Sequence, residues 1–147
     1  MKILRAEANH AGLIAPLFDQ YRQFYRMSAD EAGAEKFLRE RMQKNESVIF
    51  VATDDAGAAL GFTQLYPSFS STVMKRLWIL NDLYVVPQYR RSGVAKALME
   101  RARQWGIETG AAELMLETAV DNEKAQRLYE SLGWKRDTEF LTYHLLL

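Results

Sequence analysis

The segment Arg90-Arg91-Ser92-Gly93-Val94-Ala95 is a glycine turn between an apolar run and a helical run. It follows the strand-like run Leu80 to Val86 and opens the helix-like run Val94 to Trp105. The first N–H groups of a helix have no partner within the helix, and the helix dipole adds partial positive charge there. With two arginines beside them, these groups predict a site for a phosphorylated ligand. From these residues alone, an ordinary helix start with solvated arginines is an equal alternative.

The composition is that of a globular protein. Of the 147 residues, 48% are apolar and 26% are charged, which is enough for one domain with a core and too little chain for two ordinary domains. No repeat, low-complexity tract or linker interrupts the chain, so we expect a single domain over residues 1–147. Nineteen basic residues balance nineteen acidic ones, and this net charge favours neither a nucleic-acid nor a membrane partner.

The chain has no cysteine, which excludes disulfides, thiolate metal sites and a cysteine nucleophile. His10 and His144 are isolated and lack metal-ligand spacing, so no metal is expected. The N-terminus has Glu7 among its first residues and lacks the apolar core of a signal peptide, and no run approaches the roughly 20 apolar residues of a membrane span. We therefore expect a cytoplasmic protein.

Two helices are predicted after a first strand, Lys2 to Ala6. Apolar residues follow helical spacing over residues 9–24, where Pro16 marks either the start of the helix or a kink. Ser28 and Glu31 form a capping-box pattern that opens a second helix reaching residue 44.

The rest of the chain predicts six strands and two helices. The strands are Ser47 to Thr53, Ala59 to Leu65, Leu77 to Val86, Leu114 to Thr118, and a final hairpin around Trp134 to Lys135 and Phe140 to Leu146. The helices are Val94 to Trp105 and the run Ala125 to Leu132, which Gly133 closes. Pro67 to Lys75 is expected to be a polar loop. The nearly continuous apolar run from Leu77 is typical of a central strand covered on both faces.

Two motifs occur in order along the chain. They are Leu83-Tyr84-Val85-Val86-Pro87 with Tyr89 to Ala95, and Asn122, Ala125, Leu128-Tyr129 with Gly133-Trp134. They resemble the acetyl-CoA-binding motifs of GNAT superfamily N-acetyltransferases. The order strand, two helices, three strands, helix, strand, helix, two strands is also the family's. The resemblance therefore implies an α/β (α+β) GNAT acyl-CoA N-acyltransferase fold with a central mixed sheet flanked by helices. A looser similarity to small histone and polyamine acetyltransferases runs through Ile79 to Val85 and the segment Tyr66 to Phe69.

The resemblance implies acetyl-CoA as co-substrate. In the family, the glycine turn holds the pyrophosphate, and the pantetheine arm lies beside the fourth strand, where a backbone N–H near Tyr84 or Val85 stabilises the oxyanion. Asn122 matches a position that contacts the arm, and a helix cap is an equally good interpretation. The expected cofactor-binding residues are Leu83, Tyr84, Val85, Arg90, Arg91, Ser92, Gly93, Val94, Ala95, Lys96 and Asn122.

Tyr129 and Asp82 are the expected catalytic residues. The matching tyrosine of family members commonly protonates the departing thiolate, whereas packing in the core is the alternative for Tyr129. Asp82 is the first candidate for the base or amine-binding carboxylate and Glu117 the second, with a structural buried carboxylate as the alternative for either. Asn81 stands where similar sequences often carry glutamate, which weakens a mechanism with two carboxylates.

The expected reaction moves the acetyl group of acetyl-CoA to a primary amine by direct attack in a ternary complex, because no cysteine is present to form an acetyl-enzyme. The alternative is a non-catalytic acetyl-CoA-binding sensor or scaffold of the same fold. The acceptor stays open between a small molecule and a protein amine. Tyr25, Met27, Phe69 and Tyr84 are expected to wall its pocket, and the apolar run Phe140 to Leu147 makes a homodimer plausible.

Overall fold

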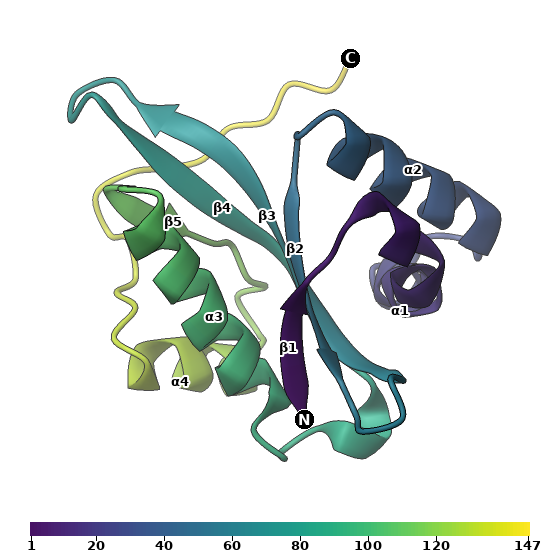
Figure 1. The fold of residues 1–147 in the computed structure, drawn as a ribbon. Coiled ribbons are helices and arrows are strands. Elements are labelled where there is room, and N and C mark those ends of the chain that lie inside the picture. The colour runs from purple at the N-terminus through teal and green to yellow at the C-terminus, as the bar shows by residue number, and fades with distance from the viewer. The chain divides into compact units, whose positions relative to one another are not determined.

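The computed structural model describes residues 1–147 (Figure 1). These residues form two compact units, Met1–Leu116 and Glu117–Leu147. The first unit holds a five-stranded sheet and three helices, and the second holds helix α4 (Glu123–Ser131). A single domain over the whole chain stays a prediction. None of the helices is long and apolar enough to cross a membrane.

The sheet has the strand order β1-β2-β3-β4-β5. Its strands are β1 (Lys2–Arg5), β2 (Val48–Thr53), β3 (Ala59–Ser70), β4 (Lys75–Val85) and β5 (Glu113–Met115). The first four pair antiparallel with their neighbours, whereas β5 pairs parallel with β4. The predicted mixed sheet is therefore confirmed, and so is the order of elements from β1 to α4.

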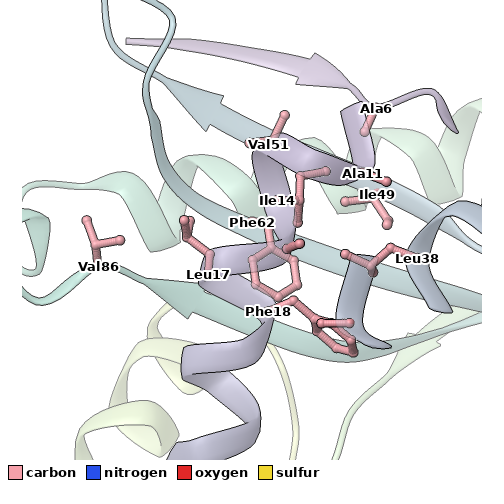
Figure 2. Close-up of a cluster of buried hydrophobic side chains, with 12 residues drawn as sticks. Ala6, Ala11, Ile14, Leu17, Phe18, Leu38, Ile49, Val51, Phe62 and Val86 are labelled. Carbon is pink, nitrogen blue, oxygen red and sulfur yellow. The ribbon is translucent and has the colours of Figure 1, made fainter. Parts of the chain in front are cut away.

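Helices cover both faces of this sheet (Figure 1). They are α1 (Ala11–Phe24), α2 (Glu31–Gln43) and α3 (Val94–Glu108). Strand β2 shows the two faces, because successive side chains of a strand point in opposite directions. Ile49 and Val51 are buried with residues of α1 and α2, among them Leu38, as Figure 2 shows. Phe50 points the other way, and its ring lies 6.0 Å from that of Trp105 on α3.

The start of α2 differs from the prediction. Asp30, and not Ser28, is the N-terminal cap, and its carboxylate accepts the Gly33 N–H at 3.0 Å. Asp19 of α1 fixes the approach to this cap, because it is buried and accepts hydrogen bonds from the backbone N–H of Asp30 and from the side chains of Arg22 and Gln23. The Asp30 hydrogen bond, helped by Arg22 and Gln23, lowers the pKa of Asp19 below its ordinary value. The capping-box prediction was therefore wrong, although the helix itself is present.

Strands β3 and β4 are longer than predicted at the end where they turn. Their pairing continues to Ser70 and Lys75, so the polar loop expected from Pro67 shrinks to residues 71–74. Pro67 fits into β3 because it lies beyond the last pair with β2, that of Val48 with Leu65. A missing N–H costs little where a strand has a neighbour on one side only.

The final hairpin expected around Trp134 to Lys135 and Phe140 to Leu146 is not formed. Residues 133–147 contain neither helix nor strand, and the apolar side chains of Phe140 and Leu141 are exposed. An alternating apolar run becomes a strand only where a neighbouring strand supplies hydrogen-bond partners. The strand predicted from Leu114 to Thr118 is also shorter, since β5 ends at Met115.

Gly61 allows β3, β4 and α3 to approach closely. A Cβ on this residue would lie 2.7 Å from the backbone oxygen of Tyr84 and 3.2 Å from Val94 Cγ1. A backbone oxygen moves only if its strand moves. We therefore predict that Gly61→Ala lowers the free energy of unfolding by about 1–3 kcal/mol, measured by urea denaturation.

Gly12→Ala is the matched control. Its Cβ would meet only the flexible end of the Glu35 side chain at 3.4 Å, within helix α1. Alanine favours a helix over glycine by roughly 0.5–1 kcal/mol, so this variant should be as stable as the parent protein or more stable. An equal decrease in the free energy of unfolding in Gly61→Ala and Gly12→Ala would contradict the close approach at Gly61.

Candidate functional site

An open pocket of about 510 Å³ lies in the first unit, between α1, the start of α2 and the middle of β3 and β4. Five of its lining residues are aromatic. The lining residues are Phe18, Tyr21, Arg22, Tyr25, Met27, Asp30, Gly33, Ala34, Phe37, Tyr66, Asn81 and Asp82. This volume is within the usual range for small-molecule sites.

A bulge in β4 places Asp82 at this pocket. Gln64 pairs with Asp82 and Leu65 with Leu80, so Asn81 is an extra residue with no partner on β3. Bulges of this kind redirect side chains and are frequent beside active sites. Asp82 is only 3% exposed, and its carboxylate accepts hydrogen bonds from Gln64 Nε2 at 2.5 Å and Asn81 Nδ2 at 3.0 Å.

Burial raises the pKa of Asp82 above its ordinary value, although its hydrogen bonds with Gln64, Asn81 and Tyr21 act in the opposite direction. Burial also raises the pKa of Tyr21 and of Tyr66, and the nearby charge of Asp82 adds to both shifts. Both phenols are therefore neutral at physiological pH. A carboxyl with a raised pKa, held among neutral phenols, is suited to accept and release a proton.

The turn before α3 presents backbone donors. Gly93 caps the helix with φ +87° and Arg91 has φ +62°, both in the left-handed region. No side chain caps the helix, and the hydroxyl of Ser92 instead donates to the carbonyl oxygen of Tyr89. A Cβ on Gly93 would meet no atom within 4 Å, so the space in front of the turn is open. Arg91 and Lys96 are exposed beside it.

Arg90 is directed toward β4. Its Nε donates to the carbonyl oxygen of Val85 at 2.9 Å, and its guanidinium lies 5.5 Å from the ring centre of Tyr84. The hydroxyl of Tyr84 in turn donates to Gln20 of α1 at 2.9 Å. The turn, the end of β4 and helix α1 are therefore joined by one chain of contacts.

The end of β4 has an open edge. Strand β5 pairs with β4 only from Leu77 to Ile79, so the later residues have no strand partner on that side. The N–H of Val86 donates to Leu60 of β3, and because these groups alternate along a strand, the N–H of Tyr84 also points to β3. The N–H groups of Leu83 and Val85 point to the open side. Of the two amides considered for the oxyanion, only that of Val85 is therefore available.

The remaining predicted site residues belong to the second unit. The side chain of Asn122 accepts the Ala125 N–H at 3.3 Å and thus caps α4, as one of its two interpretations expected. Tyr129 is half-buried, and its ring lies 6.4 Å from that of Trp134. Glu117 is exposed and follows the end of β5 instead of lying on that strand. The parts of these residues in catalysis or cofactor binding stay predictions.

The pocket contains some of the expected wall residues. Tyr25 and Met27 line it, whereas Phe69 and Tyr84 do not. Phe69 is 69% exposed on the extended part of β3, where the guanidinium of Arg76 lies over its ring. Four aromatic residues that the sequence did not indicate also line the pocket: Phe18, Tyr21, Phe37 and Tyr66. Phe18 and Tyr21 belong to the helical spacing predicted over residues 9–24, which indicates a buried helix face and does not distinguish a pocket from a core.

The raised pKa of Asp82 gives a prediction for stability. A carboxyl whose folded pKa exceeds its unfolded value, about 3.9, stabilises the protein most below that value, and this contribution disappears as the pH rises through the folded pKa. Asp82→Asn should therefore gain stability relative to the parent protein between pH 4 and pH 8, in urea denaturation. Gln64 Oε1, buried without a partner, can accept the new amide hydrogen once its own amide rotates.

Asp55→Asn, in the exposed turn between β2 and β3, is the matched control for the loss of one carboxylate. The difference in free energy of unfolding between Asp82→Asn and Asp55→Asn should increase as the pH rises from 4 to 8. A constant difference over this range would contradict the raised pKa.

Comparison with known proteins shows the family of this chain. The acetyltransferase (GNAT) family profile matches residues 14–134. The chain is 48% identical to the uncharacterized N-acetyltransferase YhfO of Bacillus subtilis (strain 168), over 99% of this chain and 97% of that protein.

Solved structures agree with this match. The crystal structure of a probable acetyltransferase covers 100% of this chain and 98% of its own, with a TM-score of 0.94 and 47% identity. An aminoglycoside N-acetyltransferase in complex with CoA has a TM-score of 0.81 at 22% identity, over 98% of this chain and 93% of its own, which shows the common fold. The chain therefore belongs to the acetyltransferase (GNAT) family.

Proposed function

We propose that this protein transfers the acetyl group of acetyl-CoA to a primary amine by direct attack in a ternary complex. One observation carries the proposal: β4 combines a pocket carboxyl, Asp82, with an open backbone edge at Leu83 and Val85. A single strand thus offers a place for an amine and, within three residues, a place for an acyl donor.

The turn before α3 is the proposed site for the pyrophosphate of CoA. Its uncapped N–H groups, the open space at Gly93 and the exposed cations of Arg91 and Lys96 suit a group with two phosphates. The pantetheine arm then runs along the open edge of β4 and bonds to the backbone of Leu83, which leaves the N–H of Val85 for the thioester oxygen. The CoA complex of the aminoglycoside N-acetyltransferase, which shares the fold, supports the choice of this cofactor.

The chemistry requires a neutral amine, because an alkylammonium has a pKa near 10.4 and is almost wholly charged at neutral pH. Asp82 accepts the ammonium proton, directly or through one water. The amine nitrogen then bonds to the thioester carbonyl carbon, and the N–H of Val85 stabilises the oxyanion. The carbon–sulfur bond breaks, CoA leaves as a thiolate, and Tyr129 gives its proton to the sulfur. The amide nitrogen and Asp82 each lose one proton to solvent, and Tyr129 regains one from it, so that one proton is released in each turnover.

Two other expectations accompany this proposal. A homodimer is one, based on the apolar run from Phe140 to Leu147, whose larger side chains are exposed. A cytoplasmic location is the other. Both stay predictions.

Release of free thiol tests the reaction. Purified protein with acetyl-CoA and a panel of primary amines should release CoA thiol and yield N-acetylated product, followed with a thiol reagent and by mass spectrometry. Tyr129→Phe should lower kcat by about tenfold or more with little change in acetyl-CoA affinity, because the thiolate loses its proton donor. Tyr143→Phe, an exposed tyrosine, is the control. Binding of acetyl-CoA without thiol release from any amine would instead support the sensor or scaffold alternative.

Gly93→Val tests the donor site. The new side chain would project into the open space before the turn, and its backbone would be strained at φ +87°. We expect the dissociation constant for acetyl-CoA, measured by calorimetry, to rise by roughly tenfold or more, which corresponds to about 1.4 kcal/mol or more of lost binding free energy.

Gly57→Val is the control for backbone strain. Gly57 has φ +86° and open space around it, but it lies in the turn between β2 and β3. Its substitution should lower stability without weakening acetyl-CoA binding. Equal affinities in the two variants would place the pyrophosphate elsewhere.

A further inference from the structure

The pocket holds few charges that could bind a cation. Arg22, Asp30 and Asp82 are its charged residues. Arg22 is paired with Asp19 at 2.7 Å, and Asp30 caps α2 through the N–H of Gly33. Asp82 is therefore the one lining carboxyl that neither pairs with a cation nor caps a helix.

The phenols do not add negative charge. The hydroxyl of Tyr21 donates to the backbone oxygen of Asn81 at 3.2 Å, and burial raises the pKa of both Tyr21 and Tyr66. Their hydroxyl groups therefore stay protonated. A ligand with several ammonium groups would leave most of them without a counterion in this pocket, which carries a desolvation cost.

Five of the nine uncharged lining residues are aromatic, and four of these rings pack against one another. The rings of Tyr21 and Tyr25 are 5.0 Å apart and those of Phe18 and Phe37 are 5.9 Å apart. Packed rings give a fixed apolar wall at little cost in conformational entropy. Such walls bind flat or bulky apolar groups, and tyrosine faces also attract a single cation.

We propose that the acceptor is a primary monoamine whose amino group is joined by a short linker to an aromatic body, and not a polycation. The amino group meets Asp82, and the body lies against the rings of Tyr21, Tyr25 and Tyr66. This inference rests on the proposed function and narrows it. It also separates this chain from the aminoglycoside N-acetyltransferase that shares its fold.

A competition among amines tests the inference. We expect kcat/KM for 2-phenylethylamine and tryptamine to exceed that for spermidine and kanamycin by at least about tenfold, measured by thiol release. Equal or better turnover of spermidine or kanamycin would overturn it.

Tyr25→Leu tests the aromatic wall. It should raise KM for 2-phenylethylamine by about three- to tenfold and leave kcat almost unchanged, because the ring contributes binding and no chemistry. Phe69→Leu is the matched control, since Phe69 is an exposed ring on β3 outside the pocket. The same KM in the two variants would overturn the role of this wall.

N,N-dimethyl-2-phenylethylamine separates this inference from the proposed function, because a tertiary amine binds without forming a stable amide. Its binding in the presence of CoA is measured by calorimetry with parent protein and Tyr25→Leu. One outcome is that the tertiary amine binds, that Tyr25→Leu weakens this binding, and that no amine releases thiol. In that case the proposed function fails and the ligand class stands. If only polycations are acetylated, the proposed function stands and the ligand class fails. If no amine binds or reacts, both fail.

Discussion

The unequal pairing of β4 is the constraint on which the rest of the site depends. On one side β4 follows β3 along almost its whole length, and on the other it meets β5 at three residue pairs only. The first side gives β4 a rigid position in the sheet. On the β5 side, the last residues of β4 keep hydrogen-bond donors without a strand partner. On the exposed edge of a sheet, such donors favour unwanted pairing with a strand of another molecule. In an acetyltransferase this edge is suited to a substrate arm that behaves like a strand.

The bulge at Asn81 adds a chemical feature to this architecture at a cost in stability. It brings Asp82 to the pocket, opposite Gln64, where burial makes ionisation unfavourable. A well-packed apolar residue there would favour folding more than a carboxyl does. The chain instead carries a carboxyl there, which accepts hydrogen bonds from two amide groups. This agrees with a role in proton transfer, because functional residues commonly reduce the stability of a fold. Gln64 Oε1, left without a partner, matches this view, because its amide can serve either protonation state by rotating.

Much of the fold could be predicted from the sequence, because apolar spacing and turn residues act locally. The helices, the β2–β3 hairpin and the glycine turn before α3 were found in this way. The predictions were wrong where contacts between residues far apart in the sequence determine the local structure. Pro67 lies within a strand because of where β2 ends, and Asp30 replaces Ser28 as the cap because Asp19 holds its backbone. For the site, Asp82 could be selected from its strand, but its bulge and the rings around it come from pairing between strands and from packing of α1, which residue spacing does not encode.

The contacts of Arg90 mean that the two halves of the site are mechanically linked. Arg90 holds the end of β4, its charge lies over Tyr84, and Tyr84 is bonded to Gln20 on the helix that also carries Tyr21. The turn and the helix that forms one wall of the pocket are therefore connected through side-chain contacts. Thermodynamic linkage is reciprocal. If a ligand at the turn raised the affinity of the pocket for its own ligand, the pocket ligand would raise the affinity of the turn by the same factor. Arg90, Tyr84 and Gln20 are the side chains through which such a coupling would act.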